Sequence, residues 1–156
     1  MNSEKLLEGL VKEGKLKRQK TNINYLEGLL CAAKENFSAA RNSYKSGFKT
    51  AAFKSAYDGL LQISRTVLLL NGYLPDDGEQ HKTTFYVASL LLGADFKILI
   101  DRIDRYRIKR NQCLYQPLDL ISSSEAEGIL SISQKFCEKT EKYFRSKNPQ
   151  LGMFNG

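Results

Sequence analysis

The sequence predicts an all-α fold, an antiparallel up-and-down bundle of four main helices with short extra helices. Apolar residues recur at steps of three and four along most of the 156 residues, which is the period of one helix face. No stretch alternates apolar and polar residues between turn signals, so no strand is predicted. Three prolines and 42% hydrophobic residues are typical of one domain with a sizeable core.

Residues 1–21 are expected to form a short basic arm at the N-terminus. A helix is expected over about residues 3–19, with Ser3 as its N-cap and a narrow leucine stripe. Lysine and arginine dominate its end, which favours a solvated edge. We therefore divide the chain into this arm, a bundle over residues 22–146 and a flexible tail over residues 147–156.

Two long helices joined by a very short turn are expected next. The first begins at Asn22 or Asn24, both good capping residues, and ends at Ser46-Gly47. The second covers about residues 49–70 and has the widest apolar face, so it is expected to be the most buried helix. The short turn makes the pair antiparallel.

The second half of the chain predicts three more helices, over about residues 81–92, 94–114 and 123–146. Pro117 ends the middle one, because proline cannot continue the hydrogen-bond ladder. The spacing of Ser122 and Glu125 is a capping-box pattern for the last.

Several aromatic residues and all three cysteines lie at positions that predict burial in the core. The aromatic residues lie at helical spacing. The cysteines are too far apart for a disulfide framework or a zinc site and are expected as small buried side chains. No metal or cofactor is expected. They are Tyr25, Phe37, Tyr44, Phe48, Phe53 and Tyr57, with Cys31, Cys113 and Cys137.

The charge balance favours anionic partners. Twenty-four Lys and Arg stand against 17 Asp and Glu, which gives a formal net charge of +7. The charged N-terminus carries no apolar core of a secretory signal, and the apolar runs are too short to span a bilayer. A cytoplasmic protein without membrane contact is expected.

The helix over residues 94–114 carries the most informative residue, Arg110. This arginine falls in register with the apolar stripe that contains Ile103 and Tyr106. An inward arginine is costly unless an anion or polar group meets it. Its guanidinium fits either a ligand's phosphate or an acid on another helix, such as Asp58, and the pattern leaves both alternatives open.

Further basic residues flank this stripe. Asp101 precedes Arg105 by four residues and Asp104 precedes Arg107 by three, so both pairs are expected to support the helix. Arg105 is expected on a solvated face, whereas Arg107 borders the inner stripe.

Three short motifs resemble the HEPN superfamily. They are Ala56-Tyr57 on the central helix, His81-Lys82 after a loop, and Arg110-Asn111 followed by Tyr115. The resemblance covers residues 22–146 and implies a small helical bundle, often a homodimer and frequently encoded with a minimal nucleotidyltransferase. Many members of that superfamily are ribonucleases with an Arg-x-x-x-x-His motif, frequently with asparagine second.

Tyr115 stands where that histidine would be. A tyrosine with a pKa near 10 is a poor base at neutral pH, although it can donate a hydrogen bond to phosphate or stack on a base. His81 is the only histidine and is expected mainly as a residue at a helix start. A catalytic role would require it to lie against Arg110.

Three functions follow as hypotheses. The favoured one is a binding or regulatory protein for RNA or a nucleotide, or a partner of a nucleotidyltransferase in a toxin–antitoxin-like pair. Its contact residues would be Arg105, Arg107, Arg110, Asn111 and Tyr115. The alternatives are a metal-independent ribonuclease, with Arg110, Tyr115 or His81 taking part, and a protein-interaction module in which Arg110 is structural.

Overall fold

The computed structural model describes residues 2–116 and 121–151, and within them it confirms the all-α prediction. The six α-helices are α1 (Ser3–Lys12), α2 (Ile23–Lys45), α3 (Lys49–Leu70), α4 (Gln80–Leu92), α5 (Lys97–Tyr115) and α6 (Ser123–Lys147). Two short 3₁₀ turns, η1 (Ala94–Phe96) and η2 (Pro149–Leu151), follow α4 and α6.

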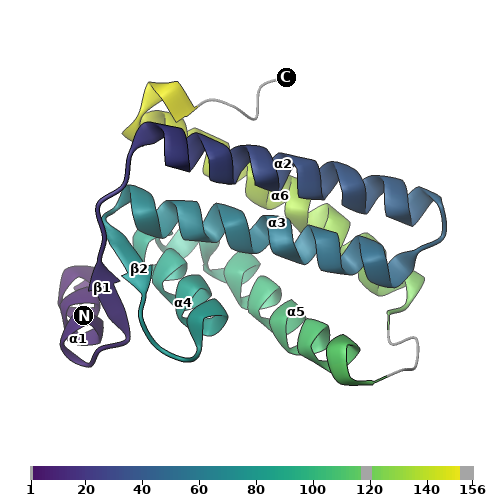
Figure 1. The fold of residues 1–156 in the computed structure, drawn as a ribbon, viewed down its shortest axis with the longest axis horizontal. Helices are drawn as coiled ribbons and strands as arrows, with labels where there is room; N and C mark the ends of the chain where they lie inside the picture. Colours follow the sequence, from purple (N-terminus) through teal and green to yellow (C-terminus); the bar gives the residue numbers. More distant parts are fainter. Residues whose placement is uncertain (1, 117–120, 152–156) are drawn as a thin grey trace.

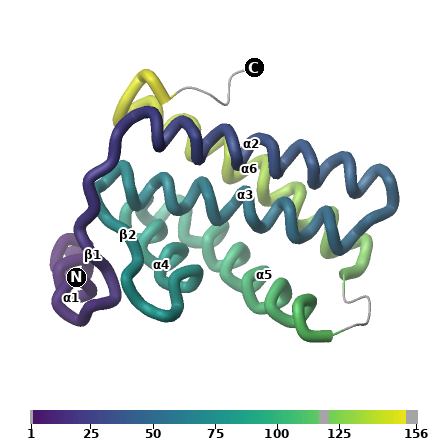
Figure 2. The backbone as a smooth tube through the Cα atoms, viewed as in Figure 1, coloured from purple at the N-terminus to yellow at the C-terminus, as the bar shows by residue number. Residues whose placement is uncertain are grey.

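Helix α3 is the centre of the fold, as its wide apolar face predicts. Figure 1 shows α2 on one side of it and α4 and α5 on the other, with α6 behind, and α3 contacts all four. Twelve of its residues are buried, among them Phe53 and Tyr57. The tube in Figure 2 shows α2 and α3 as an antiparallel hairpin. Because α3 contacts both α4 and α5, it can hold the start of α4 close to the end of α5.

Local sequence signals set the helix ends. Gly47 and Gly72 adopt φ values of 86°, the left-handed region that glycine enters without steric cost, directly after α2 and α3. Asn22 caps α2 by accepting a hydrogen bond from the backbone N–H of Tyr25. The capping box of Ser122 and Glu125 is present at the start of α6.

Two short strands were not predicted from the sequence. Strand β1 (Leu16–Arg18) pairs antiparallel with β2 (Tyr73–Pro75), with Leu16 opposite Pro75. Three residues are too few to show an alternating pattern, so only the tertiary pairing reveals them. The expected helix over residues 3–19 therefore ends at Lys12, and its cap is Asn2 rather than Ser3.

The prediction of burial in the core is wrong for several residues. Tyr25 and Phe48 are exposed, by 51% and 65%, and Tyr44 is only partly buried. Tyr25 lies in the first turn of α2 and Phe48 precedes α3, so no neighbouring helix covers these ends. Cys31 is exposed as well, because it lies about 100° around α2 from buried Leu30.

The structure describes the first part of the predicted tail, as far as residue 151. Leu151 is fully buried at η2, which contacts α6 and α2. The expected break at Pro117 and the rest of the tail, residues 152–156, lie outside the described residues. None of the described helices is both long and apolar enough to cross a bilayer.

Candidate functional site

Helix α5 directs Arg110 toward α3. Two turns earlier Ile103 is fully buried, and Tyr106 lies edge-on to Phe53 of α3, with ring centres 5.5 Å apart. Arg110 follows Tyr106 by four residues and continues this face. Its side chain is 23% exposed, so it is largely inside the protein as the sequence predicts.

The partner of Arg110 is an acid of the protein itself. Its Nη2 lies 3.8 Å from Oδ1 of Asp58, and its Cζ lies 5.3 Å from the centre of the Tyr57 ring. The buried Nε of Arg110 has no hydrogen-bond partner among the described residues. This is the internal arrangement expected of a structural arginine, and it joins α5 to α3.

Tyr57 connects Arg110 to His81. The Tyr57 hydroxyl lies 3.2 Å from Nδ1 of His81, the second residue of α4. Burial lowers the pKa of His81, and the positive charge of Arg110 lowers it further. The imidazole is therefore neutral at neutral pH, with Nδ1 facing the Tyr57 hydroxyl and Nε2 making no hydrogen bond with a described residue. Three helices thus meet at one polar cluster.

The pKa values of Asp58 and Tyr57, the neighbours of Arg110 in this cluster, are also shifted. Burial raises the pKa of Asp58, and the charge of Arg110 opposes that rise. Burial raises the pKa of the Tyr57 hydroxyl well above its usual value, so the phenol stays protonated. We call Tyr57, Asp58, His81 and Arg110 the α3–α5 cluster.

A hollow of about 540 Å³ opens beside this cluster, between the start of α4 and the end of α5. We call it the α4–α5 hollow. Its lining residues are Asp77, Gly78, Glu79, Gln80, His81, Lys82, Arg107 and Asn111. His81 belongs to both the cluster and the hollow, so the two are one continuous site.

Both cations of the hollow have acidic neighbours. Arg107 donates from Nε to Oδ1 of Asp104 at 2.8 Å, which confirms the predicted pair, and this hydrogen bond raises the pKa of Arg107. The bond holds one edge of the guanidinium and leaves its terminal nitrogen atoms for another group. Lys82 lies 3.9 Å from a carboxylate oxygen of exposed Glu79, a weak pair.

The acids of the preceding loop serve the start of α4. Asp77 accepts hydrogen bonds from the Thr83 hydroxyl at 2.8 Å and from the backbone N–H of Glu79 at 3.2 Å. These contacts hold the carboxylate of Asp77 against the first turn of α4. The hollow therefore combines the N–H donors of Arg107, Lys82 and Asn111 and the ring of His81, which suit phosphate oxygens and base edges, with the exposed carboxylate of Glu79.

The structure divides the predicted site residues into two groups. Arg107 and Asn111 line the hollow, and Arg110 supports it from within the cluster. Arg105 is exposed, and Tyr115, with 85% of its surface exposed, is not among the lining residues. The expected pair of Asp101 and Arg105 is wrong, because Asp101 lies 3.5 Å from Lys97 instead.

Sequence reasoning missed part of this site. Lys82 and Gln80 line the hollow, and Tyr57, expected only as a core aromatic, contacts His81 and Arg110 as well as the core. The adjacency of His81 and Lys82 at the start of a helix was the available signal for Lys82. No sequence pattern places α4 beside the end of α5.

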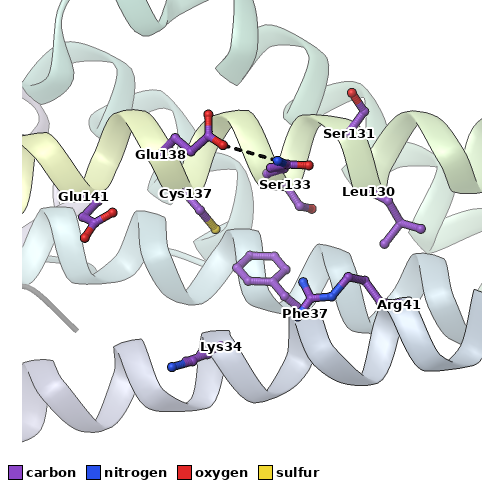
Figure 3. A pocket seen from close by; sticks show the side chains of 10 residues that line it. Lys34, Phe37, Arg41, Leu130, Ser131, Ser133, Cys137, Glu138 and Glu141 are labelled. Carbon is purple, nitrogen blue, oxygen red and sulfur yellow. Dashed lines mark hydrogen bonds between the residues drawn. The ribbon is translucent and has the colours of Figure 1, made fainter. Parts of the chain in front are cut away.

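A second hollow, of about 620 Å³, lies between α2 and α6 and contains none of the predicted site residues. Figure 3 shows Cys137 of α6 directed toward Phe37 of α2, and the lining also includes Lys34 and Arg41 on α2 and Glu138 and Glu141 on α6. Burial raises the pKa of the Cys137 thiol to about 12, so it is a poor nucleophile at neutral pH. Opposed charges on the two walls favour no single class of ligand.

Within residues 2–116 and 121–151, no three His, Cys, Asp or Glu side chains are grouped to hold a metal ion. No protein-family model, no curated protein and no solved structure matches this chain. The candidate site therefore rests on geometry and chemistry alone.

Proposed function

We propose that this protein binds a phosphate-bearing ligand, RNA or a nucleotide, in the α4–α5 hollow and acts as a binding or regulatory component. The observation that supports the proposal most is the convergence of Arg107, Asn111, Lys82 and His81 on one hollow. The net charge of +7 would attract such ligands from a distance.

In this proposal the donors have separate roles. Arg107 and Lys82 bind phosphate oxygens, since both can direct N–H groups at an anion. Asn111 and neutral His81 hydrogen-bond to a base edge or a sugar hydroxyl. Each role requires only groups that already line the hollow.

Arg110 is a positioning residue in this account. It bridges Asp58 and the face of Tyr57, and Tyr57 contacts His81. Removing Arg110 would release the end of α5, which carries Arg107 and Asn111. The proposal thus differs from the expectation that Arg110 itself binds the ligand.

Binding of a labelled single-stranded RNA tests the proposal, measured by fluorescence anisotropy at low salt. We expect Arg107→Ala to weaken binding about tenfold, because one phosphate contact is lost. Lys135→Ala is the matched control, since Lys135 is an exposed cation on α6 outside the hollow. Equal loss in both variants would reduce the interaction to general attraction by a basic protein.

A second candidate function is RNA cleavage, favoured by the position of His81. A neutral imidazole beside Tyr57, with its pKa lowered by burial and Arg110, suits a general base near neutral pH. It would remove the proton of a 2′-hydroxyl bound in the hollow, whose oxygen then attacks the adjacent phosphorus and displaces the 5′-oxygen, which takes a proton from water. Incubation of RNA with the purified protein in EDTA tests it, with His81→Asn as the inactive variant, and intact RNA with the wild-type protein would overturn it.

The resemblance to HEPN proteins adds a protein partner to the proposal, a nucleotidyltransferase in a toxin–antitoxin-like pair. An acidic partner surface would complement the exposed basic residues of α5, Arg102 and Arg105. Co-expression with the product of the neighbouring gene tests this, and failure of the two proteins to copurify at low salt would contradict it.

A further inference from the structure

A groove continues from the α4–α5 hollow along α4 and toward the start of α5. Its volume is about 470 Å³, and Lys82 lines both the groove and the hollow. Asp104 of the groove accepts the hydrogen bond of Arg107, which lines the hollow. Because two contacts join them, the groove and the hollow are neighbouring parts of one surface. We call the new part the Tyr86 groove, after a tyrosine in its lining.

The floor of the Tyr86 groove is apolar. Phe85 of α4 is 1% exposed and Ile100 of α5 is 2% exposed, and both line the groove. Leu90, also in the lining, is partly buried. An apolar floor accommodates a flat, weakly hydrated group and disfavours a hydrated ion.

Tyr86 is the exposed aromatic side chain of this groove, with 46% of its surface exposed. It follows Lys82 by about one turn of α4, roughly 6 Å along the helix axis. Proteins that bind single-stranded nucleic acids combine cations along the backbone with aromatic rings on which the bases stack. Lys82 and Tyr86 have this arrangement, with the cation at the boundary between the hollow and the groove.

The charges of the groove favour a nucleobase over a second phosphate. The carboxylate of Asp101 lies 3.5 Å from Lys97, which neutralises that cation. Arg107 donates to Oδ1 of Asp104, and Oδ2 makes no hydrogen bond with a described residue. Carboxylate oxygens repel phosphate but accept hydrogen bonds from the amino groups of bases.

We propose that the Tyr86 groove is a second nucleotide subsite, in which Tyr86 stacks on a nucleobase that carries an exocyclic amino group. The inference rests on the proposed function, because the α4–α5 hollow must hold the neighbouring nucleotide. Cytosine, adenine and guanine carry such an amino group, and uracil does not. The ligand is then a short single-stranded RNA rather than a free mononucleotide.

The two subsites divide the ligand between them. Lys82 and Arg107 bind the phosphate that joins two nucleotides, and the ring of Tyr86 covers the base on the groove side. Asp101 and Asp104 accept from the amino group of that base. A mononucleotide in the hollow leaves the groove empty, so affinity should rise with the length of the RNA.

Isothermal titration calorimetry at low salt tests this with CMP and the 5′-phosphorylated cytidine trinucleotide. The wild-type protein should bind the trinucleotide at least about tenfold more tightly than CMP, because a stacked base is added. Tyr86→Ala should remove most of this difference. Tyr25→Ala is the matched control, since Tyr25 is 51% exposed on α2 and is not in the lining of the groove, and it should keep the difference.

A fluorescent variant reports stacking directly. The chain contains no tryptophan, so Tyr86→Trp introduces a single indole and keeps an aromatic ring. The trinucleotide should quench its fluorescence, and the affinity of this variant should stay near that of the wild type. The same trinucleotide should leave the fluorescence of Tyr25→Trp unchanged. Circular dichroism of each variant checks that the bundle still folds.

The uridine trinucleotide tests the choice of base. Cytosine and uracil have rings of the same size and differ at position 4, where cytosine has the amino group. The cytidine trinucleotide should therefore bind several-fold more tightly. Equal affinity for the two would overturn the role of the carboxylates in selecting the base.

The two proposals fail in different ways. Arg107→Ala should weaken both CMP and the trinucleotide, which marks the hollow. Equal wild-type affinity for CMP and the trinucleotide, or an unquenched Tyr86→Trp, would overturn the second subsite and leave binding in the hollow standing. Absence of binding of either ligand to the wild-type protein would overturn the proposed function and the second subsite together.

Discussion

The guanidinium of Arg110 lies over the face of Tyr57, with Cζ 5.3 Å from the ring centre, and Tyr57 in turn contacts His81. One arginine thus links the motif on α5 to the histidine on α4 through a residue of α3. The positive charge faces the electron-rich side of the ring, a stabilising arrangement in a partly buried site. This link makes the three motif segments one unit.

Replacing Arg110 should destabilise the fold. Arg110→Ala removes the contact with Tyr57 and leaves Asp58 without its cation, at a cost of about 1–3 kcal/mol. The melting temperature should fall by several degrees, since about 1 kcal/mol corresponds to about 2–4 °C at this chain length. Thermal denaturation followed by circular dichroism measures it.

Arg110→Lys separates charge from shape. Lysine keeps the positive charge near Asp58 but lacks the planar group that covers the Tyr57 ring, so we expect an intermediate melting temperature. A melting temperature unchanged in Arg110→Ala would show that this residue does not hold the cluster.

The single histidine should titrate below its ordinary pKa of 6.5. Burial disfavours the charged imidazole, and Arg110 repels it. The unfolded chain then binds the proton more readily than the folded one. Stability due to neutral His81 is therefore complete above about pH 6.5 and is lost as the pH falls from there through the folded-state pKa.

The NMR signal of the His81 ring measures this pKa directly, because the chain holds one histidine. In Arg110→Ala the pKa of His81 should rise toward its ordinary value. In His81→Asn the decline of stability just below pH 6.5 should become shallower. A wild-type pKa at or above 6.5 would contradict the dominance of burial and Arg110 over the attraction of Asp58.

The contact between Gly59 and Phe37 should tolerate no methyl group. A Cβ at Gly59 would lie 2.6 Å from Cε1 of Phe37, a carbon of a buried ring. Gly59→Ala should therefore cost about 1–3 kcal/mol in the free energy of unfolding, even though alanine favours helices. Urea denaturation measures this cost.

Gly28→Ala is the matched control, because Gly28 is also helical and nothing lies within 4 Å of its Cβ position. It should gain up to about 1 kcal/mol. Equal effects at both glycines would contradict the close packing of α2 on α3.

Much of the fold could be predicted because its signals are local. Apolar periodicity located the long helices, and Asn22, Gly47 and the capping box of Ser122 located three of their ends. The strands and the exposed positions of Tyr25 and Phe48 depend on which elements become neighbours. Periodicity shows that a residue lies on the apolar face of its helix. Only tertiary packing shows whether another helix covers that face as far as its ends.

The site was predictable in part for the same reason. The inward register of Arg110 follows from its spacing with Ile103 and Tyr106. The choice between Asp58 and an external anion does not, since both satisfy an inward arginine. The hollow requires the start of α4 to lie beside the end of α5, an arrangement between elements that the order of residues does not determine.

The salt dependence of RNA binding tests the central claim, the phosphate-binding role of the α4–α5 hollow, most directly. The logarithm of the association constant should fall linearly with the logarithm of salt concentration, with a slope set by the number of phosphate contacts. For Arg107→Ala the account predicts a slope smaller by about one contact and weaker binding, whereas Lys135→Ala keeps the wild-type slope. An Arg107→Ala slope equal to that of the wild type, or no RNA binding by the wild type at low salt, would contradict the account.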